Sequence, residues 1–144
     1  EGYVHDQGAA MVGGVSGHAG LFASANDLAI LYQMLLNRGV YGGTQYFKSE
    51  TADTFTAKQS DVSRRGLGFD RWDPESTNGY PSRLASPQTY GHTGYTGTCV
   101  WVDPKYNLIY IFLSNRVNPT VGTKLSDLNI RGRIQDVIYE AIVK

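Results

Sequence analysis

The sequence predicts an α+β fold in which helices pack against an antiparallel sheet. Two segments have the apolar spacing of amphipathic helices, one around residue 30 and one at the C-terminal end. Between them, residues 96–102 and 108–115 have the composition of strands. The short segment 103–107 that joins these strands contains Asp, Pro and Asn, which favour turns and predict a hairpin.

The first 39 residues divide into a loop and a helix. Residues 1–22 are rich in glycine and have neither helical nor strand periodicity, so we expect a compact irregular loop. Ser24, followed three residues later by Asp27, forms a capping-box pattern that predicts the start of a helix, and Gly39 favours its end. The apolar residues of this helix recur at helical spacing: Leu28, Leu31, Tyr32 and Leu35.

The middle of the chain predicts shorter elements. Residues 41–43 contain two glycines and favour a turn, residues 49–57 predict a short helix, and residues 64–72 predict a strand. Residues 73–89 form a long polar segment with three prolines. A loop of this length in a compact domain is often functional or a lid.

The C-terminal third predicts the main strand and the last helix. Residues 108–113 have no polar face, so we expect a central strand that is covered on both sides. The last helix has an apolar stripe, which consists of Ile130, Ile134, Val137, Ile138, Ala141 and Ile142. Its charged residues are expected to form the solvated face: Arg131, Arg133, Asp136, Glu140 and Lys144.

Composition excludes several classes of protein. We expect residues 1–144 to belong to one domain, since a chain of this length buries one core. Lys plus Arg and Asp plus Glu each number 13, which argues against binding to nucleic acid or to an anionic membrane. Hydrophobic content of 41% and charged content of 18% are inconsistent with disorder. No apolar run approaches the roughly 18 residues of a membrane helix.

The segment 91–98, Gly-His-Thr-Gly-Tyr-Thr-Gly-Thr, combines several groups that can carry chemistry. His92, Thr93 and the nearby backbone offer an imidazole, a hydroxyl and N–H groups at the entry to a strand, and a developing oxyanion needs such donors. Alternatively, this is a glycine-rich strand entry in which the histidine only forms structural hydrogen bonds. Spacing alone leaves both interpretations open.

A second group of polar residues lies in the N-terminal loop. His5, Asp6 and His18 could form a dyad assisted by Ser16, or a metal site of two histidines and one carboxylate. Structural hydrogen bonding to loop carbonyls is the more common role of such histidines, and we favour it. The single cysteine, Cys99, excludes an internal disulfide and is expected to be a buried small hydrophobe. Three aromatic residues beside the long loop could line a cleft or be ordinary packing: Trp72, Tyr80 and Tyr90.

The order of these motifs resembles the serine β-lactamase and penicillin-binding-protein superfamily. The resemblance is carried by residues 13–22, the helix from Ser24, residues 66–69, His92-Thr93-Gly94 and the terminal hairpin and helix. It is closest to the class C-like branch, which includes D-alanyl-D-alanine peptidases and esterases. Residues 65–70 and 113–116 look like the bacterial branch that is sometimes fused to a family 3 glycoside hydrolase.

This resemblance implies an incomplete β-lactamase/transpeptidase-like fold. Residues 1–144 would be the C-terminal portion of such a domain, and the N-terminal portion with the nucleophile would be missing. The implied chemistry is acyl transfer through a serine ester, which needs Ser-x-x-Lys, Tyr-x-Asn or Ser-x-Asn, and Lys-Thr-Gly on a strand.

Only the third of these elements is matched. His92-Thr93-Gly94 has histidine in place of lysine, which argues against strict β-lactamase specificity because a histidine is cationic only part of the time near neutral pH. The resemblance further implies that the backbone N–H of Tyr95 is an oxyanion donor and that Asn118 meets the substrate carboxylate. None of the five lysines follows a serine by three positions, and no tyrosine precedes an asparagine by two. Ser24-Ala25-Asn26 fits Ser-x-Asn, but helix capping explains it.

Two functions follow as expectations. The first is the C-terminal fragment of a serine hydrolase that acts through an acyl-enzyme on D-alanyl peptides, β-lactams or small esters and is inactive alone. The second is a non-catalytic module of the same fold that binds a cell-wall peptide or glycan. We expect no cofactor, no metal and no nucleic acid, a small-molecule or peptide substrate, and the missing N-terminal part of the domain as partner. Exposed apolar surface would allow self-association, and the family implies a periplasmic, cell-envelope or secreted location.

Overall fold

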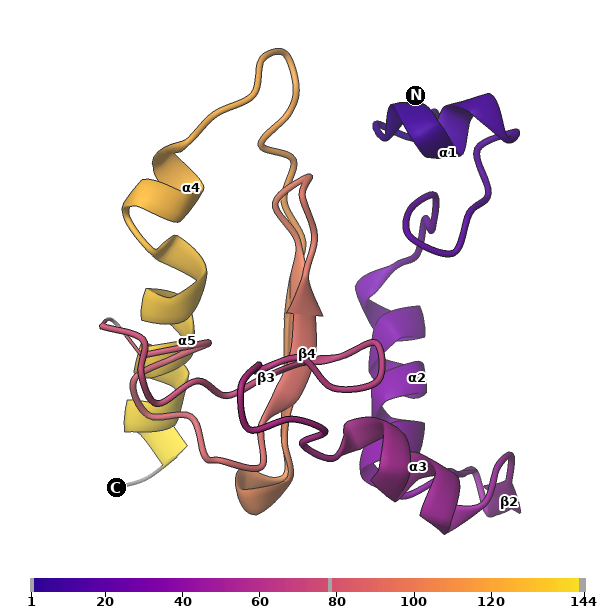
Figure 1. Ribbon diagram of the computed structural model, residues 1–144, viewed down its shortest axis with the longest axis vertical. Coiled ribbons are helices and arrows are strands. Elements are labelled where there is room, and N and C mark those ends of the chain that lie inside the picture. The colour runs from indigo at the N-terminus through magenta and orange to yellow at the C-terminus, as the bar shows by residue number, and fades with distance from the viewer. Residues whose placement is uncertain (1, 78, 143–144) are drawn as a thin grey trace.

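The computed structural model describes residues 2–77 and 79–142, and Figure 1 shows their arrangement. The helices are α1 (Gln7–Met11), α2 (Ala25–Leu36), α3 (Ser49–Thr56), α4 (Lys124–Asp127) and α5 (Ile130–Ile142). The strands are β1 (Val40–Tyr41), β2 (Thr44–Gln45), β3 (Asp70–Arg71), β4 (Tyr90–Thr93), β5 (Cys99–Asp103) and β6 (Leu108–Phe112). Strands β3 to β6 form an antiparallel sheet in the order β3-β4-β5-β6, while β1 and β2 form a separate hairpin. The α+β prediction is confirmed.

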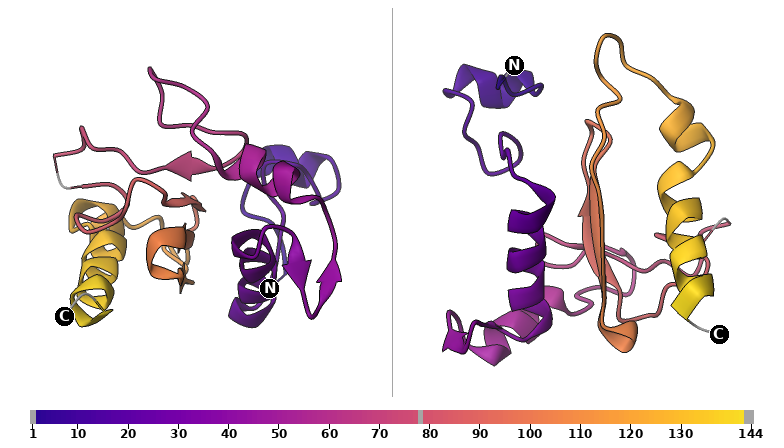
Figure 2. Two further views of the ribbon diagram at one scale, coloured as in Figure 1. Left: turned by 90° about the horizontal axis from the view of Figure 1, so that it is seen from below. Right: turned by 180° about the vertical axis from the view of Figure 1, so that it is seen from behind.

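The sheet lies between two helices. Helix α2 covers one face and α5 the other, as both Figure 1 and the right-hand view of Figure 2 show. Strand β5 is the most enclosed, with all five residues buried. Its Cys99 and Trp101 form a core cluster with Tyr110 of β6, and Ile138 of α5 packs against this cluster. The core therefore lies mainly between the sheet and α5.

Helix α2 forms where the sequence predicts it. The Ser24 Oγ accepts a hydrogen bond from the Asp27 N–H at 3.2 Å, and the Asp27 carboxylate accepts one from the Ser24 N–H at 3.1 Å. At the other end, the Gly39 N–H donates to the Met34 carbonyl at 2.8 Å. The left-handed turn begins one residue before the glycine, because Arg38 already has a φ of 54°. Local signals are sufficient for this helix.

Helix α5 also forms as predicted, but its orientation differs from the prediction. Its buried residues are Gly132, Gln135, Asp136 and Tyr139. Ile134, Val137, Ala141 and Ile142 of the predicted apolar stripe are exposed. Placing Asp136 on the solvated face is wrong, because its carboxylate accepts hydrogen bonds from residues of the 73–89 loop. Lys144 lies outside the described residues.

Two predictions about strands need correction. Residues 64–72 are mostly a turn, in which Gly66 N–H donates to the Phe69 carbonyl at 2.8 Å and Gly68 has a φ of +85°, so only β3 is a strand. Helices α2 and α5 lie on the two faces of the sheet, but β6 is at the edge of the described sheet rather than at its centre. Only Tyr110 of the 108–113 segment is buried, and Leu113 is 45% exposed, so the predicted cover on both sides is incomplete. The predicted short helix is confirmed as α3, and the glycine turn joins β1 to β2.

The segments predicted as loops are more ordered than expected. Residues 1–22 contain α1, whose N-terminus is capped by the Asp6 carboxylate accepting from the Ala9 N–H at 2.8 Å. The 73–89 loop is confirmed, but it packs into the domain, since Ser82, Ser86 and Thr89 are buried. Within the described residues, no helix has the length and apolarity needed to cross a membrane.

Candidate active site

The His-Thr-Gly segment lies on β4, an inner strand of the sheet. Gly91 pairs with Asp70 of β3 and with Trp101 of β5, and His92 pairs with Val100. A Cβ at position 91 would lie 2.0 Å from the Val100 carbonyl oxygen, so only glycine fits here. The next glycines close a turn, in which the Gly94 N–H donates to the Thr98 carbonyl at 2.8 Å. Gly91 is therefore needed for packing between strands, and Gly94 for the turn that follows β4.

The end of β4 opens onto a cleft with a volume of about 990 Å³. His92, Thr93, Gly94 and Tyr95 all line it, so four of the five predicted site residues are together. Asn118 is exposed and is not among the lining residues of the described chain, whereas its neighbours Asn115 and Val117 are. The N-terminal segment forms part of the same cleft through Asp6 and His18.

Both ring nitrogens of His92 have hydrogen-bond partners. Its Nδ1 lies 2.7 Å from the carbonyl oxygen of Thr93, and its Nε2 lies 2.5 Å from an Nη of Arg65. Arg65 also lies 3.7 Å from the carboxylate of Asp70 on β3. Histidine 92 is therefore linked through an arginine to a carboxylate on the neighbouring strand.

Asp70 is 1% exposed and organises this side of the sheet. It accepts hydrogen bonds from the Arg64 Nε at 2.8 Å and from the Tyr80 hydroxyl at 2.7 Å. The Asp70 carboxylate raises the pKa of Arg64, and burial, followed by the bond to Asp70, raises the pKa of Tyr80. Both groups therefore keep their protons at neutral pH, which is the state in which they donate to Asp70.

Tyr95 is held between two side chains from distant parts of the sequence. Its ring stacks on His5 with a centroid distance of 5.4 Å, and the Arg116 guanidinium lies 4.4 Å from its ring centroid. The Arg116 Nε donates to the Tyr95 carbonyl at 2.6 Å and an Nη donates to the Gly122 carbonyl at 3.0 Å. Sequence reasoning missed Arg116 in this role, and no local signal identifies it, because 21 residues separate it from Tyr95.

Ser16, His18 and Asp6 form the hydrogen-bonded group that the sequence left open. The Ser16 Oγ lies 2.9 Å from His18 Nδ1, and His18 Nε2 lies 2.8 Å from the Asp6 carboxylate. The bond from the Ala9 N–H and then the bond with His18 lower the pKa of Asp6, so this carboxylate is ionised at neutral pH. His5 stacks on Tyr95 instead of joining this group. In the part of the chain that is described, no three His, Cys, Asp or Glu residues are placed to hold a metal ion.

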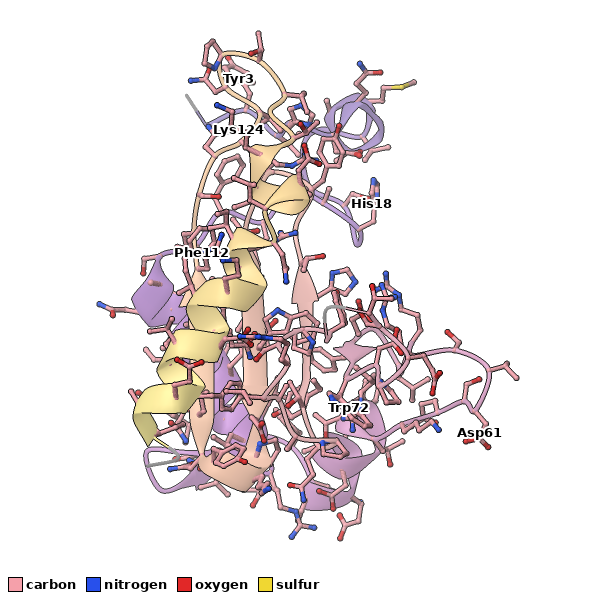
Figure 3. The ribbon with its side chains drawn as sticks, turned by 90° about the vertical axis from the view of Figure 1, so that its left-hand side faces the viewer. Tyr3, His18, Asp61, Trp72, Phe112 and Lys124 are labelled. Carbon is pink, nitrogen blue, oxygen red and sulfur yellow. The ribbon has the colours of Figure 1, made fainter. Side chains whose placement is uncertain are left out.

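The remaining candidates are packing residues. Cys99 is buried, and burial raises the pKa of its thiol to about 11, which makes it a poor nucleophile near neutral pH. Tyr80 packs edge-on against Trp101, and Tyr90 packs edge-on against Phe69. Trp72 borders a separate hollow and lies at a different height along the sheet from His18, as Figure 3 shows.

Comparison with known proteins gives consistent matches. Residues 1–132 match the family described as "Beta-lactamase". The chain is 42% identical over 152 aligned residues to an Escherichia coli K12 protein named "Putative D-alanyl-D-alanine carboxypeptidase". This alignment covers 98% of this chain and 35% of that protein. A Salmonella typhi protein of the same name is 41% identical over 130 residues, covering 90% of this chain and 30% of that protein. The chain thus spans about a third of the length of these relatives.

A solved structure also aligns with the fold. It is described as "Crystal structure of putative beta-lactamase from Bacteroides dorei DSM 17855". The alignment has a TM-score of 0.49 and 16% sequence identity, and it covers 85% of this chain and 47% of that chain.

Proposed function

The chain belongs to the β-lactamase family, and from this premise we propose that it is the C-terminal portion of a serine hydrolase that works through an acyl-enzyme. D-alanyl peptides are the substrate class that the names of the relatives favour, with β-lactams and small esters as further substrates of the same chemistry. The observation that carries the proposal is the placement of His92, Thr93, Gly94 and Tyr95 together on one wall of a cleft.

In acyl transfer, a serine hydroxyl gives its proton to the catalytic base while its oxygen attacks a carbonyl carbon, and the carbonyl oxygen becomes an oxyanion. The oxyanion collapses, the C–N bond to the leaving amine breaks, and that amine takes a proton from the catalytic base. We propose that the Tyr95 N–H donates to the oxyanion and that the Thr93 hydroxyl donates to the bound substrate. The stacking of Tyr95 between His5 and Arg116 supports this role, because fixed donors stabilise a developing charge without reorganising. Asn118 is proposed to meet the substrate carboxylate.

The serine and its base must come from another segment, since the chain has no Ser-x-x-Lys and no Tyr-x-Asn. We therefore propose that the chain alone is inactive and that its partner is the N-terminal portion of the same domain. Exposed apolar side chains on the outer faces of the two covering helices support such a partner: Ile30 and Leu31 of α2, and Ile134, Val137 and Ile142 of α5. Without the partner, the same faces would drive self-association. The family and its D-alanyl peptide substrates further support a location in the cell envelope.

The test compares this chain with a longer polypeptide in which the remaining length of the relatives precedes it. We expect a fluorescent penicillin to label the longer protein covalently, with a matching mass increase, and the longer protein to release D-alanine from a D-alanyl-D-alanine peptide. The chain alone should do neither. A matched Thr93→Val variant of the longer protein should fold and be acylated more slowly.

The alternative function is a non-catalytic module that binds a cell-wall peptide or glycan. One observation favours this alternative: the chain that forms the cleft contains no Ser-x-x-Lys motif that could supply a nucleophile. A thermal shift of the longer protein with the peptide, but no mass increase and no released D-alanine, would support this module and contradict the hydrolase.

A further inference from the structure

The two contacts of the His92 ring determine which of its nitrogens carries the proton. The partner of Nδ1 is the Thr93 carbonyl oxygen at 2.7 Å, which can only accept a hydrogen bond. Nδ1 must therefore be protonated. The partner of Nε2 is the Arg65 guanidinium at 2.5 Å, which can only donate. Nε2 must therefore present its lone pair, and these contacts together select the neutral Nδ1–H tautomer.

Arg65 is itself held in position. Its guanidinium lies 3.7 Å from the buried Asp70 carboxylate, which also binds Arg64 at 2.8 Å. The Arg65 side chain is 52% exposed, so its charge remains in contact with water at the surface of the domain. The charged groups near the Arg65 side of the His92 ring are thus Arg65, Arg64 and Asp70. Asp73 lies further along, with its carboxylate 3.9 Å from Arg64.

We propose that Arg65 is the positioning residue of the His-Thr-Gly segment: it fixes the neutral Nδ1–H tautomer of His92 and supplies the positive charge that the imidazole does not carry. His92 then has no N–H directed into the cleft and no free lone pair, so it does not transfer protons. The charge half of this proposal rests on the proposed acyl transfer, in which positive charge stabilises the oxyanion of the transition state. Arg65 is not among the described residues that line the cleft, so its charge acts on the site across the His92 ring. The tautomer half does not depend on it.

Arg65 differs from its neighbour Arg64 in a way that provides a matched control. Both arginines lie beside Asp70, but Arg64 makes the shorter contact with this carboxylate and stacks 4.4 Å over the Tyr80 ring. Arg65 makes the contact with His92. A change at Arg64 therefore disturbs the same carboxylate and leaves the imidazole contact in place, whereas a change at Arg65 removes that contact.

The first test measures the ring nitrogen shifts of His92 by NMR, using this chain labelled with ¹⁵N-histidine at neutral pH. We expect a protonated Nδ1 and an unprotonated Nε2 in the unchanged chain and in Arg64→Gln. Arg65→Met, which has no donor, should allow the Nε2–H form as well and give averaged shifts, and Arg65→Lys should keep the Nδ1–H form because an ammonium also donates. A protonated Nε2 or averaged shifts in the unchanged chain would overturn the proposal, whether or not any variant folds.

The second test measures acylation of the longer protein by a fluorescent penicillin. Arg65→Gln should slow acylation by about 10-fold to 100-fold, below the loss of about 100-fold or more that follows removal of a direct oxyanion donor. Arg64→Gln should change it by less, and an unchanged rate in Arg65→Gln would overturn the charge half. If the unchanged longer protein is not acylated, the proposed function fails, and the NMR result still decides the tautomer.

Discussion

Replacing Asp136 by alanine tests whether the hydrogen bonds between α5 and the 73–89 loop stabilise the folded chain. Asp136 is 4% exposed. It accepts hydrogen bonds from the Ser82 hydroxyl at 2.5 Å, from the Arg83 N–H at 2.9 Å and from the Arg83 Nε at 2.6 Å. These contacts join residues that are 53 and 54 positions apart in the sequence. Alanine removes all three acceptor contacts at once.

The expected loss follows from what each donor does afterwards. The Ser82 hydroxyl is 1% exposed, and leaving it without an acceptor costs about 1–3 kcal/mol. The partly buried Arg83 N–H loses its acceptor as well, at about 1 kcal/mol. The Arg83 guanidinium is exposed and stays solvated after the change, so the loss of its ion pair adds little. The free energy of unfolding should therefore fall by about 3 kcal/mol.

Urea unfolding followed by tryptophan fluorescence measures this loss. With an m-value of about 2 kcal/mol/M, the midpoint should move down by about 1.5 M. Asp136→Asn should lose less than Asp136→Ala, because its carbonyl oxygen can still accept from Ser82. Glu140→Ala removes a charge from the exposed side of the same helix and should change stability by less than about 0.5 kcal/mol. A loss as small as this for Asp136→Ala, with an unchanged m-value, would refute the reasoning.

Three further predictions concern other parts of the chain. Gly91→Ala should lower the free energy of unfolding by about 1–3 kcal/mol, because the added Cβ meets the neighbouring strand. Gly17→Ala should have little effect, because nothing lies within 4 Å of a Cβ there, and urea unfolding of the two variants measures the difference. The hydrogen bond from the Ala9 N–H lowers the pKa of Asp6. The stability that the ionised Asp6 gives to α1 is therefore complete above the ordinary carboxyl pKa and is lost as the pH falls through the lowered pKa of the folded chain. Amide exchange at Ala9 should therefore accelerate below about pH 4, and a rate that follows base catalysis alone would count against this. Burial raises the pKa of Cys99 to about 11, so iodoacetamide at pH 8 should modify it slowly in the folded chain and rapidly in urea, and equal rates would contradict its burial.

The elements that sequence predicts best are those whose stabilising contacts are local. The capping box of α2 joins Ser24 to Asp27 within four residues, so its pattern is visible in the sequence. The turn between β5 and β6 is similar, since the Asp103 carboxylate accepts from the Lys105 N–H and Asn107 adopts a left-handed conformation. In both cases, the residues that form the structure are neighbours along the chain.

The orientation of α5 could not be predicted for the opposite reason. Its inward face is determined by Asp136 and Tyr139, which bind Ser82 and Asp103, respectively. Without those partners, an aspartate in a helix is expected on the solvated side, and isoleucines are expected inside. The apolar stripe identified the helix, but the distant polar contacts determined which side is buried.

The candidate site shows the same division. The His-Thr-Gly segment was identified because its residues are consecutive, whereas Arg65 is 27 residues from His92 and carries no pattern of its own. The sequence therefore named the imidazole but not the cation beside it. The partner of His92 Nε2 is thus a residue that no local pattern identifies.

The burial pattern of α5 also bears on what the chain needs from its surroundings. The helix already directs polar side chains inward: Asp136 bonds to the loop and Tyr139 to β5, whereas the buried Gln135 Oε1 has no hydrogen-bond partner among the described residues. Its apolar side faces outward, with Val137 64% exposed, and α2 on the far side of the sheet exposes Ile30 and Leu31. Burying apolar area stabilises a protein by about 25 cal/mol per Å², so two helices with uncovered apolar faces leave stabilisation unused. An arrangement with polar contacts inside and apolar residues outside is favourable when both faces of the helix are covered, and this supports the proposal that the chain is one portion of a larger domain.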